Sequence, residues 1–115
     1  MLIAGPNIKI YLCLGITDMR KGASSLAMLA SGLTADNVCS GAMFIFRGKS
    51  ADKIKILWWD GQGFCLFYKC FDKGKFIWPK ADSKGVIGLT SAQLSMLIEG
   101  VDWRMPSWSS PPLYA

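Results

Sequence analysis

Hydrophobic and polar positions alternate most clearly between residues 42 and 79, and this alternation predicts a series of β-strands. β-Branched and aromatic residues gather there in short runs bounded by Gly, Asp and Lys, which is the usual signal for strands. The predicted strands are Ala42–Arg47, Lys53–Trp59, Phe64–Phe71 and Lys75–Trp78. Between the second and third strands, Asp60-Gly61-Gln62-Gly63 predicts a tight hairpin, because Gly takes the positive φ of the tip without steric cost.

A two-residue loop at Gly61-Gln62 fixes how these two strands pair. The facing residues are then Trp59 with Phe64, Leu57 with Leu66, and Lys55 with Tyr68. Because side chains alternate along a strand, one face carries Lys53, Lys55, Leu57, Trp59, Phe64, Leu66, Tyr68 and Cys70. The other face carries Ile54, Ile56, Trp58, Cys65, Phe67 and Lys69. Both faces are apolar near the turn, so we expect that end to be covered on both sides, or covered on one side and used for binding on the other.

The residues before these strands predict one strand and one helix. Ile8–Leu14 alternates as a strand does and ends at Gly15. A helix is predicted from Met19 to Ser31, with Thr17 or Asp18 as its N-cap and Gly32 as its C-cap. Its apolar stripe, with spacings of three and four, comprises Met19, Ala23, Leu26, Ala30 and Leu33.

The residues after these strands predict a second strand–helix unit. Gly85–Leu89 is a short strand, and Thr90 and Gln93 have the spacing of a capping box. The helix that follows carries an apolar side that includes Leu94 and Leu97, and it ends at Gly100. Together the elements predict an α+β fold, with an antiparallel β-meander of about five to six strands packed against two main helices.

Length and composition predict one domain over residues 1–106, because 115 residues are enough for a single hydrophobic core. Residues 107–115 are rich in Pro and Ser, so we expect a disordered tail. No apolar run approaches the roughly 18 residues that span a bilayer. The first fifteen residues lack the pattern of a signal peptide. We therefore expect a cytoplasmic protein that does not enter a membrane.

The residue types that catalysis and metal binding need are scarce. The chain has no histidine, which is the commonest general base. Most of its eight acidic residues fit caps, turns and loops. Its four cysteines contain no Cys-x-x-Cys pair and are typical of free thiols: Cys13, Cys39, Cys65 and Cys70. We expect no enzyme activity, no catalytic residue, no metal and no other cofactor.

Charge gives the strongest functional indication. The net charge is +5, and nine of the thirteen Lys and Arg residues lie between residues 47 and 84, against four acids. Such a concentration around a sheet is expected of a nucleic-acid surface, or it keeps an apolar sheet soluble. Arg20 and Lys21 fall in the first turn of the predicted helix, where a phosphate would be favoured. The alternative is that Arg20 or Lys21 pairs with Asp18 or another acid.

Aromatic residues on the same predicted face as lysines extend this hypothesis. Trp59 and Tyr68 share a face with Lys55 and could stack on bases, although filling the core is the alternative for the tryptophans. The candidate nucleic-acid-binding residues are Arg20, Lys21, Arg47, Lys49, Lys53, Lys55, Trp59, Tyr68 and Arg104.

Six motifs carry a resemblance to a known family, and they run in order over nearly the whole chain, from about Ile8 to Pro106. They are Thr17–Gly22 (TDMRKG), Phe46–Gly48 (FRG), Lys55–Gly63 (KILWWDGQG), Gly74–Pro79 (GKFIWP), Leu89-Thr90 and Gly100–Arg104 (GVDWR). The chain thereby resembles the accessory TnpB family of IS-sixty-six-type bacterial insertion sequences. That family shares only a name with the RNA-guided nucleases called TnpB.

The resemblance implies a non-catalytic accessory protein that assists DNA transposition while a separate, element-encoded transposase cuts the DNA. Two hypotheses follow. In the first, the protein binds DNA through its basic, aromatic-bearing surface and helps to assemble the transposase on the element ends. In the second, it is a protein–protein adaptor that docks on the transposase through the apolar hairpin and contacts no DNA. The apolar faces and hairpin edges leave a homodimer open.

Overall fold

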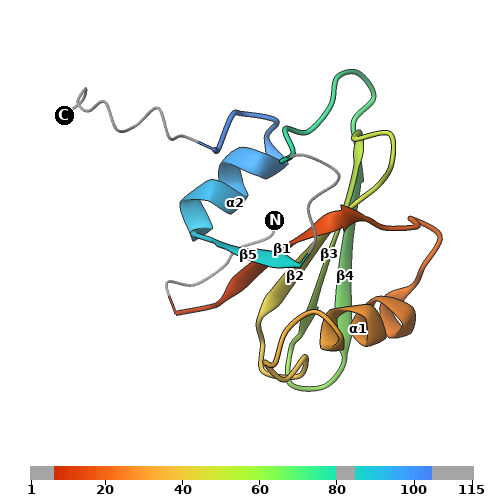
Figure 1. Ribbon diagram of the computed structural model, residues 1–115, viewed down its shortest axis with the longest axis vertical. Helices are drawn as coiled ribbons and strands as arrows, with labels where there is room; N and C mark the ends of the chain where they lie inside the picture. The colour runs from red at the N-terminus through yellow and green to blue at the C-terminus, as the bar shows by residue number, and fades with distance from the viewer. Residues whose placement is uncertain (1–6, 80–84, 105–115) are drawn as a thin grey trace.

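The computed structural model describes residues 7–79 and 85–104. Over these residues the chain forms five strands and two helices (Figure 1). The strands are β1 (Ile10–Ile16), β2 (Met43–Arg47), β3 (Lys53–Trp59), β4 (Phe64–Cys70) and β5 (Val86–Leu89). The helices are α1 (Ala23–Ser31), between β1 and β2, and α2 (Ser91–Ile98), after β5. The predicted α+β class is confirmed, whereas residues 107–115 lie outside the described residues.

The strands form one mixed sheet in the order β4-β3-β2-β1-β5. β1 and β2 run parallel, and every other neighbouring pair is antiparallel. The predicted purely antiparallel meander is therefore wrong at the centre of the sheet. The reason is that α1 forms a crossover between β1 and β2, and a crossover connection lets two successive strands run in the same direction.

The predicted strand Lys75–Trp78 is also wrong. The backbone N–H of Phe76 donates to the carbonyl of Ala51 at 2.9 Å, and the indole of Trp78 donates to the same carbonyl at 3.2 Å. These residues therefore form an extended segment that packs its aromatic side chains against the core without joining the ladder. Pro79, which has no N–H to donate, follows it.

The β3–β4 hairpin forms with the predicted register. Trp59 faces Phe64, Leu57 faces Leu66, and Lys55 faces Tyr68. Asp60 N–H donates to the Gly63 carbonyl at 3.1 Å, which closes the two-residue loop, and Gly61 takes a φ of +102°. The Asp60 carboxylate accepts from the backbone N–H groups of Gln62 and Gly63, and these bonds hold the pKa of Asp60 below its usual value.

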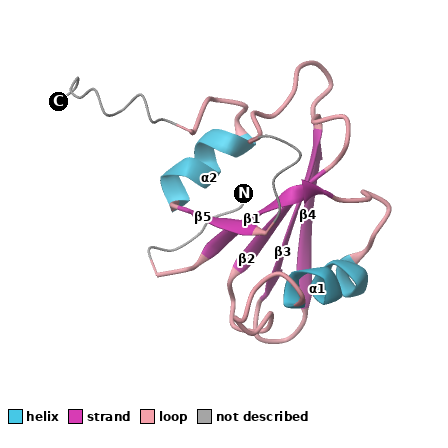
Figure 2. Cartoon of the chain, in the orientation of Figure 1, coloured by secondary structure: helices cyan, strands magenta, loops and turns pink. Residues whose placement is uncertain are grey.

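The two helices cover opposite faces of the sheet, which we call the α1 side and the α2 side (Figure 2). On the α1 side, Leu26 and Ala30 of the helix pack with Phe44 and Phe46 of β2 and with Leu57 of β3. On the α2 side, the other set of alternating strand residues packs against α2. The core on this side comprises Ile10, Leu12, Leu14, Met43, Ile45, Ile54, Ile56, Phe76, Leu89, Leu94, Leu97 and Trp103. Covering both faces explains why the central strands read as nearly continuous apolar runs.

The helix caps match the sequence at three of the four ends. Thr90 and Gln93 form the predicted capping box at α2, and that helix ends at Ile98 with Glu99 as its C-cap, just before the predicted Gly100. Gly32 is the C-cap of α1, as predicted. The N-terminus of α1 differs, because the helix begins at Ala23 behind Gly22, which supplies no side-chain cap. In the described ranges, neither helix has the length and apolar character needed to cross a bilayer.

Candidate nucleic-acid interface

Two basic loops meet at the carboxyl ends of the parallel strands. The carboxyl ends of parallel neighbours lie at one edge of a sheet, so the loop after β1 (residues 17–22) is placed beside the turn after β2 (residues 48–52). The backbone N–H of Thr17 donates to the carbonyl of Arg47 at 2.8 Å, and Thr17 is buried. This bond extends the β1–β2 pairing by one residue and fixes where the loop begins.

Gly48 allows the two loops to approach closely. A Cβ atom at this position would lie 2.8 Å from Cγ of Met19, nearer than real Cβ contacts come. The Met19 side chain therefore occupies the space that a side chain at position 48 would need. The FRG and TDMRKG motifs thus form one structural unit, although they lie far apart in the sequence.

The loops surround an open pocket of about 730 Å³, which we call the carboxyl-end pocket. Its lining residues are Ile16, Thr17, Asp18, Met19, Gly48, Lys49, Ser50 and Lys53. Lys49 and Lys53 were predicted site residues, whereas Thr17, Gly48 and Ser50 were not. The sequence held a signal for them, since TDMRKG directly follows β1 and FRG contains the last two residues of β2. Only the parallel pairing of those strands brings the two motifs together.

Arg20 takes the second of the two predicted environments, an ion pair with an acidic residue. Its guanidinium donates to both Asp18 carboxylate oxygens, with the closest contact 2.8 Å from Nη2 to Oδ2, and its backbone N–H donates to Oδ1 at 2.9 Å. The Arg20 side chain and backbone hydrogen bonds hold the pKa of Asp18 well below its usual range. Since α1 starts at Ala23, Arg20 and Lys21 precede the helix and do not form a phosphate site in its first turn. The alternative, pairing of Arg20 with Asp18, is confirmed.

The lysines around the pocket differ in exposure and in their partners, and Lys53 is half-buried. Lys53 pairs with Asp52 at 3.2 Å, and the Ser50 hydroxyl also donates to that carboxylate. These two bonds, the serine bond first, lower the pKa of Asp52. Lys49 and Lys21 are exposed and have no ion-pair partner among residues 7–79 and 85–104. They are the cations near the pocket that a ligand would find unneutralised.

Lys55 is buried, contrary to the exposed contact that was predicted. Only 7% of the residue is exposed. Its ammonium donates to the carbonyl of Lys21 at 2.8 Å and lies 4.8 Å from the ring centroid of Tyr68. Lys55 therefore holds the loop after β1 against the α1 side of the sheet, and its role is positioning.

Arg47 is the second predicted contact that proves to be buried, with 6% exposed. It lies on the α2 side, where its guanidinium is 5.3 Å from the ring centroid of Trp78 and donates to the carbonyls of Gly48 and Pro79. Burial lowers the pKa of Arg47. Arg47 therefore holds the segment that ends at Pro79, and its burial differs from the exposed contact that was predicted.

The two predicted aromatic contacts, Trp59 and Tyr68, also differ in how exposed they are. Trp59 is half-buried and packs edge-on against Phe64, with ring centroids 5.0 Å apart. Tyr68 is 48% exposed, and Lys55 covers one face of its ring. Tyr68 therefore retains free aromatic surface on the edge strand, whereas Trp59 mainly fills space near the hairpin tip.

Arg104 does not line the carboxyl-end pocket. It forms a second Asp-x-Arg pair with the geometry of the first. Arg104 Nη2 donates to Asp102 Oδ2 at 2.9 Å, and these contacts lower the pKa of Asp102 to about 2. Between them, Trp103 is buried in the α2-side core and donates through its indole to the carbonyl of Ile77 at 2.7 Å.

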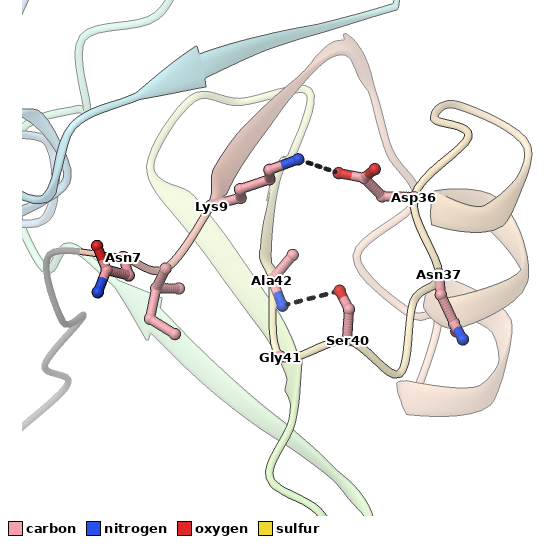
Figure 3. Close-up of a pocket in the computed structure, with 8 residues that line it drawn as sticks. Asn7, Lys9, Asp36, Asn37, Ser40, Gly41 and Ala42 are labelled. Atoms are coloured by element: carbon pink, nitrogen blue, oxygen red, sulfur yellow. Dashed lines mark hydrogen bonds and ion pairs between the residues drawn. The ribbon is translucent and has the colours of Figure 1, made fainter.

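The opposite ends of β1 and β2 form a second, smaller pocket of about 240 Å³ (Figure 3). Asp36 projects toward Lys9 there, and their charged groups lie 3.4 Å apart. The Tyr11 hydroxyl also donates to Asp36 and is the largest cause of the lowered pKa of that carboxylate. The lysine of this pocket is already paired with Asp36, whereas the carboxyl-end pocket is lined by Lys49, which has no ion-pair partner among the described residues. An anionic ligand is therefore better suited to the carboxyl-end pocket.

The described residues bring together no group of three or more His, Cys, Asp or Glu side chains that could hold a metal ion. All four cysteines are free thiols. Cys13 is buried on the α1 side, and burial raises its pKa to about 12. A thiol with that pKa is not a ready nucleophile at neutral pH.

The comparisons with known proteins agree with the family resemblance that the motifs indicated. The family model described as "IS66 Orf2 like protein" matches residues 8–108. The uncharacterized protein y4hO of Sinorhizobium fredii is 45% identical over 106 residues, covering 92% of this chain and 91% of the relative. The uncharacterized protein y4jC of the same organism is 35% identical over 102 residues, covering 86% of each. No solved structure gives a significant match. The chain belongs to the IS66 Orf2-like family and is an accessory protein of this type of insertion sequence.

Proposed function

We propose that this accessory protein binds DNA, and that the carboxyl-end pocket with its two basic loops contacts the phosphate backbone. The observation that carries the proposal is the meeting of these loops around one open pocket. It places Lys49 and Lys53 in the lining and Arg20 on the adjoining loop. Lysine and arginine contacts to phosphate supply most sequence-independent affinity for DNA.

Two of the four cations at this site already have carboxylate partners. Arg20 is paired with Asp18, and Lys53 with Asp52. Lys21 and Lys49 meet a phosphate without first giving up a carboxylate. We therefore expect the slope of log affinity against log salt concentration to lie between about −2 and −4, depending on how many of the four cations neutralise a phosphate.

Tyr68 extends the proposed surface along β4. Its partner across the hairpin is Lys55, and Lys53 of the pocket pairs with Cys70, two residues further along the strand. The exposed ring lies on the same side of the sheet as Lys53. A base or sugar stacked on such a ring typically adds about 1–3 kcal/mol and is tolerant of sequence.

The experiment is a titration of labelled duplexes, one with the element end and one random, at two salt concentrations. Lys21→Gln and Lys49→Gln should each reduce the salt slope by about 1, because each removes one phosphate contact. Lys9→Gln is the matched control, since Lys9 is an exposed lysine at the opposite end of β1. Absence of binding at low salt, or equal losses for the control, would contradict the proposal.

A second candidate is the adaptor that docks on the element-encoded transposase. It is favoured by the exposed apolar side chains of Leu66 and Tyr68 on β4, 36% and 48% exposed. The same titration separates the two functions. Capture of the transposase by a protein that binds neither duplex at low salt would support the adaptor.

A further inference from the structure

Among the described residues, β4 forms one edge of the sheet, and no strand in these ranges pairs with its outer backbone groups. The hydrogen bond between Asp60 and Gly63 sets the phase of the hairpin ladder. Counted from that pair, the backbone groups of Cys65, Phe67 and Lys69 bond to β3. Those of the alternate residues point away from the sheet: Phe64, Leu66, Tyr68 and Cys70.

This edge lacks the usual protection against pairing with another strand. Natural edges are short, bulged, or guarded by Pro or an outward lysine. β4 has seven residues, no Pro, and an unbroken register with β3. Its one charged residue, Lys69, donates to the carbonyl of Ile98 at 2.8 Å on the α2 side, so its charge is held by α2. The other edge strand, β5, has only four residues.

We propose that two copies of this protein pair through β4, antiparallel, with the two-fold axis at Phe67. In this register the outward residues of one strand face the outward residues of the other. Leu66 faces Tyr68 of the second copy, Phe64 faces Cys70, and Cys65 faces Lys69. Each outward N–H and C=O group of these strands then gains a partner, and the two sheets join into one.

The side chains fit this register. Leu66 and Tyr68 are 36% and 48% exposed on the α1 side, and pairing makes them cross-strand neighbours, a favourable aromatic–aliphatic contact. No charge faces a like charge, because Lys69 faces Cys65. Any other register shortens the paired segment or leaves outward groups facing non-outward ones.

The charges also remain apart. Lys53 pairs with Cys70, at the end of β4 away from the hairpin tip, so antiparallel pairing places the two carboxyl-end pockets toward opposite ends of the joint. A strand of seven residues is on the order of 20 Å long. Exposed charges at that distance are largely screened at physiological salt, where the Debye length is about 8 Å. The net charge of +5 therefore does not prevent the pairing.

The first test is sedimentation of the full chain under reducing conditions, without DNA. The wild type should be a dimer. Leu66→Pro removes one outward N–H per strand without touching the ladder to β3, and it should raise the dimer dissociation constant about tenfold or more. Leu66→Val, which keeps the N–H, should remain a dimer. A wild type that is monomeric at every concentration, or a dimer that Leu66→Pro leaves intact, would overturn the proposal.

A charge exchange tests the register and does not depend on the proline variant folding. The chain carrying Leu66→Lys and Tyr68→Lys, and the chain carrying Leu66→Glu and Tyr68→Glu, should each be monomeric, because positions 66 and 68 face each other across the joint. Mixed in equal amounts, they should form a heterodimer. Failure to associate on mixing would overturn this register. DNA titration of the wild type, Leu66→Pro and Leu66→Val, which all keep Tyr68 and the net charge, keeps failure of the pairing distinct from failure of the DNA proposal.

Discussion

Each face of the sheet buries one cation beneath an aromatic ring, and the two cations hold different loops. On the α1 side, Lys55 lies at Tyr68 and donates to the carbonyl of Lys21. On the α2 side, Arg47 lies at Trp78 and donates to the carbonyl of Pro79. Neither cation has a carboxylate partner within the residues described.

The difference lies in what each cation supports. Lys55 holds the loop that lines the carboxyl-end pocket, and its ring partner is exposed. Arg47 holds the extended segment that closes the α2-side core, and its ring partner is half-buried. The comparison suggests that Lys55 serves the binding surface and Arg47 serves the core, although both were predicted to contact DNA.

Replacing Trp78 and Tyr68, the rings beside the two buried cations, should give the largest difference in stability between the two faces. Trp78→Ala removes packing against the α2-side core and the indole bond to the Ala51 carbonyl, and it should lower the free energy of unfolding by about 3 kcal/mol. Tyr68→Ala, at an exposed site, should cost about 1 kcal/mol or less. Urea unfolding measures both. Equal losses would show that the faces do not differ in this way.

Replacing the cations should show which loop each one holds. Lys55→Met leaves the Lys21 carbonyl without its charged donor and should cost about 1–2 kcal/mol. Amide hydrogen exchange should become faster in residues 17–22 and remain unchanged in residues 76–78. Arg47→Met should give the reverse pattern. Faster exchange in both segments of both variants would contradict the assignment.

Adding one methyl group at Gly48, in the turn after β2, should disturb the loop after β1, because Met19 of that loop packs against Gly48. The Cβ of Gly48→Ala would lie 2.8 Å from Cγ of Met19, so that side chain must move, at a cost of about 1 kcal/mol. Gly63→Ala is the control, because nothing lies within 4 Å of a Cβ there. Thermal unfolding measures both variants. A stable Gly48→Ala with an unchanged Met19 environment would argue against close packing of the loops.

Acidification should have the smallest effect, because the carboxylates that pair with arginine are exposed. The folded-state pKa of Asp102 is lowered to about 2 from 3.8, so its contribution to stability is present above pH 3.8 and is lost as the pH falls toward 2. The stability difference between wild type and Asp102→Asn should shrink over that range. Asp18→Asn should retain its difference to lower pH, since the pKa of Asp18 is lowered further. Unfolding at several pH values measures both differences, and a pH-independent difference would contradict the linkage.

Local features of the fold were predictable from the sequence. The hairpin register followed from Gly61 and the alternation on either side of it, and the α2 cap followed from Thr90 and Gln93. Nonlocal features were not. Thr17 reads as a helix cap in isolation, but its N–H bonds to Arg47, thirty residues away in sequence, and the helix starts later. The parallel β1–β2 pair depends on the same long-range contact.

The candidate site was predictable in its residue types and not in their roles. Charge patterning drew attention to residues 47–84, and two lysines of that range, Lys49 and Lys53, line the carboxyl-end pocket. Burial of Lys55 and Arg47 depends on carbonyl acceptors 34 and 32 residues away in the chain, which no local pattern encodes. Without those acceptors, a lysine or arginine beside an aromatic residue in a strand reads as a surface contact.

The pairing of β5 with β1 has a consequence for synthesis of the protein. Ile10 is among the first residues of the sheet to leave the ribosome, yet its antiparallel partner is Leu89. During elongation at about 5–20 residues per second, one side of β1 stays unpaired for about 1–4 seconds after β4 has emerged. A nascent chain stalled after Cys70 should therefore expose a second strand edge and bind chaperones, which pulse-labelled cross-linking can detect. Completion of this sheet waits for β5, the last of its strands in chain order.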